Sequence, residues 1–141
     1  MEYTKPLPTI GDENREFWES ARQNELKMQK CSECGHIRYP ISHVCPKCLS
    51  EGFAWQKLSG EGEILSYIVF HQKYSPAFAD DLPYNVALIE LKEGPRMYSN
   101  IVGVPNDAPR VGDRVSVVFD AVTSEVSIPR FKLFNWRKKH E

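Results

Sequence analysis

The chain has 141 residues, of which 41% are hydrophobic and 26% are charged, and its formal net charge is −1. This length accommodates one modest domain together with a small module. No apolar run approaches the roughly 18 residues that a membrane-spanning helix requires, so we expect no membrane partner. A dedicated nucleic-acid-binding protein usually has a strongly basic face, so the near-neutral charge argues against nucleic acid as the partner.

Residues 1–25 are predicted to form an extended, proline-containing arm and then a helix over about 12–24. Asp12 is placed to cap this helix, and acidic residues follow it in the first turn, where they favour helix formation. Phe17 and Trp18 form an apolar patch on the helix. Two interpretations stay open: the patch packs on the rest of the chain, or it docks on a partner.

Residues 26–58 contain all four cysteines, in the pairs Cys31-Ser-Glu-Cys34 and Cys45-Pro-Lys-Cys48. Each pair has the spacing of a knuckle that turns two thiolates toward one cation, and four sulfurs around one centre are typical of a structural zinc site. Two disulfides are the alternative. They suit small secreted domains, whereas the first residues of this chain lack the apolar core of a signal peptide. We therefore predict a zinc ribbon in a reducing compartment, the cytoplasm.

A zinc ion held by four thiolates has no open position for water, whereas a catalytic zinc keeps one. The predicted metal is therefore structural, with one ion per chain. His36 and His43 lie in the same segment and are expected to stay outside the metal's ligand shell.

Residues 59–141 are predicted to be β structure followed by a basic tail. The expected strands cover residues 64–70, 84–91, 97–104, 114–121 and 126–134. The second of them is apolar on both faces, which predicts a central strand buried on both sides. Five short strands without helical periodicity between them favour a small closed barrel, for which an OB-fold is the leading candidate. The predicted fold is thus mainly β, with an N-terminal helix, a zinc ribbon and a five-stranded OB-fold barrel.

The sequence contains no recognisable catalytic set. The cysteines are committed to metal, and there is no nucleophile elbow, Walker loop or dinucleotide fingerprint. His71 is the best single candidate for an acid or base, although a hydrogen-bonded histidine at the barrel rim explains it more simply. We therefore predict that the chain by itself is not an enzyme.

Cationic and aromatic residues occur together along the predicted barrel, notably Lys73, Tyr84 and Arg96. Cationic side chains pair with phosphate, and aromatic rings stack on bases. The combination suits a nucleotide-bearing ligand such as coenzyme A, or single-stranded nucleic acid. A solvated barrel face would account for the same residues.

Several short motifs follow one another in a fixed order. The first are Leu26-x-x-Gln29-x-Cys31-x-x-Cys34-Gly35, Cys45-Pro46-x-Cys48-x-Ser50 and Trp55-x-x-x-Ser59-Gly60-x-Gly62. The later ones are Pro83-Tyr84-x-Val86-Ala87-Leu88-Ile89-x-Leu91-x-Glu93-Gly94-Pro95-Arg96 and Val111-Gly112-Asp113-x-Val115-x-Val117-x-Phe119. With the leading helix they span about residues 12–134, and together they resemble the DUF35 family. One departure is that Ile41 follows Pro40, where the family pattern has a second proline.

The resemblance implies a rubredoxin-like zinc ribbon fused to an OB-fold. Such proteins are typically companions of thiolase-superfamily enzymes, including thiolases, acyltransferases and hydroxymethylglutaryl-CoA synthases. It therefore implies a non-catalytic accessory subunit that stabilises a thiolase-like enzyme subunit and helps to bind an acyl-CoA thioester. The alternative is a single-stranded nucleic-acid-binding module, because zinc ribbons and OB-folds also serve that function and fold alone does not decide between them.

Overall fold

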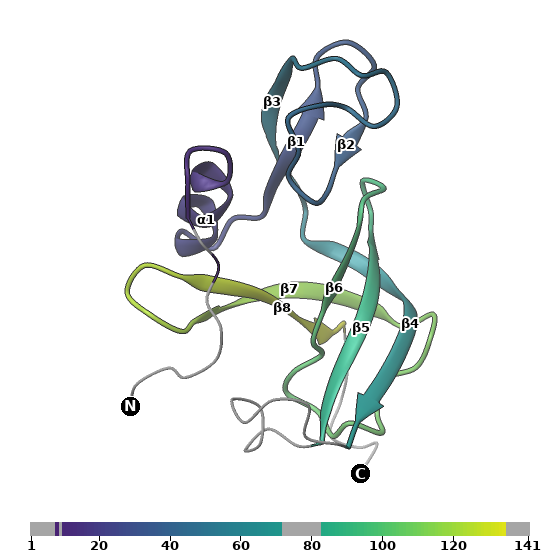
Figure 1. The fold of residues 1–141 in the computed structure, drawn as a ribbon. Helices are drawn as coiled ribbons and strands as arrows, with labels where there is room; N and C mark the ends of the chain where they lie inside the picture. Colours follow the sequence, from purple (N-terminus) through teal and green to yellow (C-terminus); the bar gives the residue numbers. More distant parts are fainter. Residues whose placement is uncertain (1–7, 9, 72–82, 135–141) are drawn as a thin grey trace.

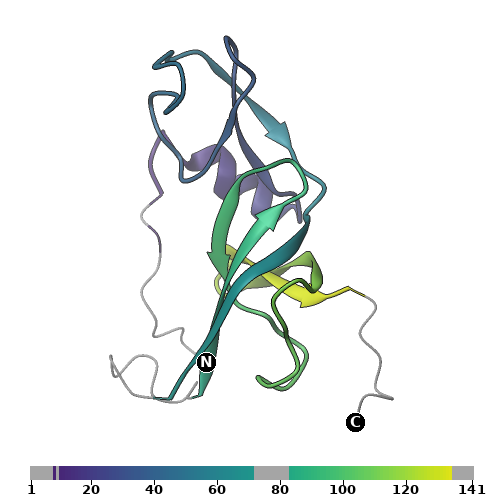
Figure 2. The same ribbon diagram turned by 90° about the vertical axis from the view of Figure 1, so that its right-hand side faces the viewer.

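The computed structural model describes residues 8, 10–71 and 83–134, and this part contains one helix and eight strands in two sheets (Figure 1). The smaller sheet has the order β2-β1-β3 and consists of β1 (Lys27–Cys31), β2 (Ile37–Arg38) and β3 (Phe53–Lys57). It lies at one end of the molecule and the larger sheet at the other (Figures 1 and 2). No helix in the described ranges is long and apolar enough to cross a bilayer.

The larger sheet is antiparallel and has the order β6-β5-β4-β7-β8. Its strands are β4 (Glu61–Phe70), β5 (Tyr84–Leu91), β6 (Arg96–Ser99), β7 (Arg114–Ala121) and β8 (Ser127–Leu133). A parallel bridge between Ile101 and Phe131 brings the two edges of the sheet together, so the sheet curls toward a barrel. The predicted mainly β architecture, with a ribbon followed by five strands, is confirmed.

The third barrel strand is shorter than predicted. The sequence suggested residues 97–104, whereas β6 ends at Ser99. After this strand, Ile101 pairs with Phe131 across the barrel, and Gly103 has a φ of +81° that turns the chain away. The residues after Ser99 therefore close the barrel instead of extending β6, although their composition alone favours a longer strand.

The second barrel strand is buried on one face only, so the prediction of burial on both faces is wrong. Along β5 the residues alternate between buried and partly exposed. Ala87, Ile89 and Leu91 point into the core, whereas Val86 and Leu88 point outward and remain partly exposed. An apolar outward face needs an explanation other than the core of this chain.

Helix α1 (Arg15–Arg22) begins a few residues later than predicted, after Asn14, whose side chain accepts a hydrogen bond from the backbone N–H of Gly11. Phe17 is buried, with 3% of its surface exposed, and its ring meets Trp18 edge-on at 5.0 Å. The helix contacts β1, β7 and β8. The aromatic patch of the helix therefore packs within the chain.

Ribbon and barrel share one hydrophobic core. Its buried members from the helix and the ribbon segment are Phe17, Leu26, Met28 and Leu58. They pack with the barrel residues Ile64, Ala87, Ile89, Leu91, Met97, Ile101, Val115, Phe131 and Leu133. The backbone N–H of Leu58 donates to the carbonyl of Leu26, so the last ribbon residue is tied to the first at the point where the chain enters the barrel.

Candidate functional site

Two similar turns bring the four cysteines together. The N–H of Gly35 donates to the carbonyl of Cys31 at 3.0 Å, and the N–H of Leu49 donates to that of Cys45 at 2.9 Å. Gly35 and Leu49 both have positive φ, +79° and +65°. Glycine adopts this conformation without steric cost, whereas leucine is strained in it. The second knuckle therefore keeps a strained backbone that the first avoids.

The sulfur atoms have the spacing of a metal cluster. The Sγ atoms of Cys31 and Cys48 lie 3.5 Å apart, as do those of Cys34 and Cys45, and all four lie within 4.8 Å of one another. A tetrahedron with zinc–sulfur bonds of about 2.3 Å has edges of about 3.8 Å, whereas a disulfide bond is only about 2.05 Å long. The four thiols therefore fit a single zinc ion and exclude the disulfide alternative.

Without a cation the cluster cannot hold four negative charges. The backbone N–H of Cys34 and that of Glu33 favour the thiolate of Cys31 and lower its pKa to about 6. The backbone N–H of Ser50 favours a thiolate at Cys48, but the three neighbouring cysteine sulfurs and burial together outweigh this donor, and the pKa of Cys48 rises to about 12. One thiolate thus keeps its neighbour protonated, and a metal ion would displace that proton.

Arg38, on the same small sheet as Cys31, is a buried cation that sequence analysis did not single out. Only 3% of its surface is exposed, and among the described residues no carboxylate pairs with it. Its guanidinium donates to the carbonyl of Ser42, at 2.8 Å from Nη2, and to Oε1 of Gln29 at 3.2 Å, and it lies over the ring of Phe53. Nη1 is buried with no hydrogen-bond partner in the described part of the chain. Arg38 therefore holds the loop that leads to Cys45.

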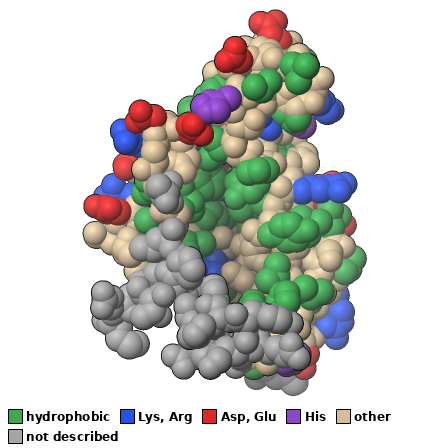
Figure 3. Space-filling model, in the orientation of Figure 1, with side chains coloured by type: hydrophobic (Ala, Val, Ile, Leu, Met, Phe, Trp, Pro, Cys, Tyr) green, Lys and Arg blue, Asp and Glu red, His purple; other side chains and the backbone are tan. Residues whose placement is uncertain are grey.

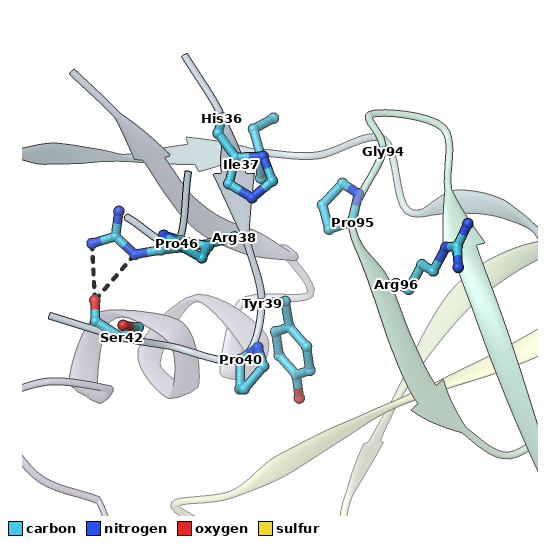
Figure 4. Close-up of a pocket in the computed structure, with 10 residues that line it drawn as sticks. All are labelled: His36, Ile37, Arg38, Tyr39, Pro40, Ser42, Pro46, Gly94, Pro95 and Arg96. Carbon is cyan, nitrogen blue, oxygen red and sulfur yellow. Dashed lines mark hydrogen bonds between the residues drawn. The ribbon is translucent and has the colours of Figure 1, made fainter. Parts of the chain in front are cut away.

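A groove of about 460 Å³ separates the ribbon from the turn between β5 and β6 (Figure 4). Its apolar lining residues are Ile37, Tyr39, Pro40, Pro46 and Pro95. Pro95 points from the hairpin toward the ribbon, whereas the Arg38 side chain extends away from Pro95, toward Ser42 (Figure 4). Burial raises the pKa of Tyr39, so its hydroxyl stays neutral. The groove is concave and mostly apolar, as small-molecule sites usually are.

The residues predicted to bind coenzyme A do not converge. Arg96 lies at the edge of the groove, where its Nε donates to Glu90 at 3.2 Å. Tyr84 stacks on Phe70 at the other end of β5, and six residues of strand from Glu90 correspond to about 20 Å. Lys73 lies outside the described residues. The structure therefore places Arg96, but not Tyr84, at the edge of the groove, and the Arg96 guanidinium points away from Pro95 and the ribbon (Figure 4).

The fold and the sulfur cluster define a zinc-ribbon and OB-fold protein. Residues 18–54 match the family model of the ChsH2 rubredoxin-like zinc ribbon domain, and residues 55–120 match that of the ChsH2 C-terminal OB-fold domain. A DUF35 domain-containing scaffold protein of Methanothermobacter thermautotrophicus is 40% identical over 101 residues, covering 71% of this chain and 75% of that protein. The chain belongs to the DUF35 family.

Two further similarities connect this family to enzymes. A solved structure described as an Ltp2-ChsH2(DUF35) aldolase has a TM-score of 0.80 and 35% identity, covering 90% of this chain and 98% of that one. A probable enoyl-CoA hydratase alpha subunit of Thermomonospora curvata is 36% identical over 128 residues. That match covers 91% of this chain but only 40% of the hydratase subunit, so the chain spans about two fifths of that relative's length.

Proposed function

We propose that this chain is a non-catalytic accessory subunit of a thiolase-superfamily acyl-CoA enzyme, stabilising its partner and helping to bind the thioester. The observation that carries the proposal is the close match, in fold and sequence, to the DUF35 chain of an aldolase. The site chemistry supports it. The described metal-ligand cluster consists of four cysteines, so a zinc ion there would have no position left for water or substrate.

In this proposal Cys31, Cys34, Cys45 and Cys48 hold one structural Zn²⁺ per chain. The sulfur spacing fits the ion, and a ribbon of this size depends on metal for its folding free energy. Thiolates need a reducing compartment, and we place the protein in the cytoplasm. Metal analysis of purified protein should give about one zinc per chain, and protein that is folded, free of zinc and disulfide-bonded would contradict the assignment.

For coenzyme A, the support comes from the groove and from Arg96. The apolar groove suits the arm of a thioester, and Arg96 at its edge is an exposed cation whose carboxylate partner, Glu90, is also exposed. A phosphate can compete for such a cation because exposed ion pairs are weak. Calorimetry with acetyl-CoA and the assembled complex should show weaker binding for Arg96→Ala than for Arg114→Ala, a matched exposed arginine with a carboxylate partner on β4.

The decisive experiment is co-purification. Tagged protein from its native host should retain a thiolase-like subunit, identified by mass spectrometry and then produced and purified on its own. The isolated chain should show no turnover of acyl-CoA substrates, whereas the enzyme subunit should gain stability or activity when the chain is added. Acyl-CoA turnover by the chain alone, or a host preparation without any acyl-CoA enzyme, would contradict the proposal.

The alternative of a single-stranded nucleic-acid-binding module predicts a different outcome. Phosphate tracks require several unpaired cations, and the binding they produce falls steeply with added salt. A fluorescent oligothymidylate should therefore bind poorly at physiological salt. Tight and strongly salt-dependent binding, without any binding of acetyl-CoA, would favour the alternative.

A further inference from the structure

The outward face of β4, β5 and β6 carries an apolar patch, in which the exposed Ser66 of β4, opposite Leu88, is a polar interruption. In β5 the residues between the buried ones point outward, and residues directly opposite in neighbouring antiparallel strands lie on the same face. Val86 pairs with Ile68 of β4, and Leu88 pairs with Tyr98 of β6. We call these four residues the sheet patch. Figure 3 shows hydrophobic side chains gathered over these strands.

The sheet patch is open to solvent. Tyr98 is 72% exposed and Ile68 is 51% exposed, and the two β5 residues between them are partly exposed. Single exposed apolar residues are ordinary, but a contiguous group on one sheet face marks an interaction surface. Tyr98 lies opposite Leu88 on the neighbouring strand, and tyrosine is one of the residue types that contribute most to binding energy at protein interfaces.

Charges border this patch at one end and are absent from its middle. Glu63 of β4, Glu90 of β5 and Arg96 of β6 lie opposite one another in the strand register. The side chains of Arg96 and Glu90 form an ion pair. An apolar centre with a polar rim is the usual anatomy of a protein–protein interface.

This charge distribution selects among possible occupants. In OB-folds the same strand face commonly binds oligonucleotides, which requires cations and aromatic rings along the track. Here the centre consists of three aliphatic side chains and one tyrosine, and β4, β5 and β6 together contain a single cation, Arg96, at the end of the patch, which is too few for a phosphate track. The face is complementary to an uncharged, apolar protein surface.

We infer that the sheet patch is the surface on which the acyl-CoA enzyme subunit docks, through an apolar and uncharged patch of its own. The inference rests on the proposed function, and it adds the location of the interface. It accounts for the composition of β5, which is apolar on both faces although this chain buries only one of them. The matched structure, an Ltp2-ChsH2(DUF35) aldolase, pairs a chain of this fold with a different protein, which favours an enzyme subunit over a second copy of this chain.

The test uses the enzyme subunit identified by co-purification, purified separately, and this chain as the full-length zinc-loaded protein. Ile68→Lys and Tyr98→Lys place a charge in the middle of the patch without entering the core. Each should weaken binding at least tenfold, measured by calorimetry, because a buried unpaired charge and the loss of an aromatic anchor both cost heavily. Val111→Lys is the matched control, since Val111 is 65% exposed and lies in the turn before β7, outside the three strands that carry the patch. It should change the affinity less than about twofold.

Zinc content and circular dichroism establish that each variant is folded. Hydrogen exchange of the wild-type complex provides an independent measurement, in which β6, an edge strand, should exchange more slowly in the presence of the enzyme. If the wild type binds the enzyme and both patch variants bind equally well, the location is wrong and the proposed function stands. If the wild type is a dimer that the patch variants dissociate, the patch belongs to a second copy and the inference is overturned. If no acyl-CoA enzyme binds the wild type, the proposed function itself fails.

Discussion

Arg38 is a buried guanidinium on the face of the ribbon sheet that also carries Cys31. It lies opposite Gln29 of β1 in the strand register. Gln29 and Cys31 are two residues apart in this strand, so their side chains lie on the same face of the sheet. A zinc ion held by four thiolates keeps a net negative charge, which a nearby buried cation stabilises. Arg38→Met should therefore lower the zinc affinity by roughly 10- to 100-fold, measured by competition with a chromogenic chelator.

Arg38→Lys is the control for this prediction. Lysine retains the positive charge but not the paired hydrogen bonds to the carbonyl of Ser42. It should recover part of the affinity lost in the methionine variant. Equal zinc affinity in the wild type and Arg38→Met would show that the guanidinium serves only the loop.

Zinc binding should release protons at neutral pH. In the metal-free protein the pKa of Cys31 is lowered to about 6 and that of Cys48 is raised to about 12, so at pH 7.5 the first is ionised and the second is protonated. Zinc displaces the proton of Cys48, so the affinity of the protein for zinc should rise with pH. The same affinity should fall below about pH 6, where Cys31 becomes protonated. Calorimetric titrations in two buffers of different ionisation enthalpy would measure the protons released. A heat of binding that is the same in both buffers would contradict the prediction.

The metal ligands could be predicted from the sequence, but their surroundings could not. A knuckle is a local structure, so the spacing of Cys31 and Cys34 is enough to identify it. Arg38 acquires its role from pairing with Gln29 on another strand and from the loop carbonyl of Ser42. Such partners become neighbours only through folding. For the same reason the sequence suggested Tyr84 and Arg96 as ligands of one molecule, although Tyr84 lies at one end of β5 and Arg96, on β6, lies opposite Glu90 near the other end.

At the scale of the elements, the turn into the barrel depends on Gly60. Its φ is +79°, and a Cβ at this position would overlap Cγ1 of Val117, whose backbone N–H donates to the carbonyl of Gly60. Gly103 has a similar φ, +81°, with no atom near the position of a Cβ. Gly60→Ala should therefore reduce the free energy of unfolding by roughly 2–4 kcal/mol and Gly103→Ala by about 1 kcal/mol, measured by urea denaturation. Equal losses would show that the backbone yields at Gly60.

Helix α1 is attached to the core chiefly by Phe17. The side chain is 3% exposed and belongs to the shared core, whereas Trp18 is only partly buried at its edge. Phe17→Ala should lower the free energy of unfolding by roughly 3–5 kcal/mol, and Trp18→Ala by clearly less. Thermal unfolding of both variants would measure the difference. A Phe17 variant as stable as the wild type would reopen the possibility that the helix serves a partner.

The types of the elements were readily predicted, and their ends were not. The strand predicted over residues 114–121 is present as β7, whereas β4 begins at Glu61, three residues before the strand predicted over 64–70. The end of β6 depends on the bridge from Ile101 to Phe131, two residues far apart in sequence. Hydrophobicity on both faces of β5 was interpreted as burial within the chain, because a sequence does not distinguish a side chain buried in a core from one left exposed.

At the scale of the whole molecule, the shared core makes ribbon and barrel one cooperative unit. Leu26 and Leu58 pack with barrel residues such as Ile64 and Phe131, so neither part can lose its structure without exposing the core of the other. Denaturation of cobalt-substituted protein should therefore show the same midpoint by thiolate–cobalt absorbance, which reports the ribbon, and by far-ultraviolet circular dichroism, which the barrel dominates. Separate midpoints would mean that the two parts unfold independently.

The sheet patch also has a consequence for the amounts in which the protein is made. Under the proposed docking, a copy without the enzyme subunit would present Ile68, Val86, Leu88 and Tyr98 to water and would tend to associate with other apolar surfaces. Surplus chains would be withdrawn by aggregation or proteolysis, while chains covered by the enzyme would survive. Balanced synthesis of the two subunits, from neighbouring genes or from one joined reading frame, would spare the cell that loss.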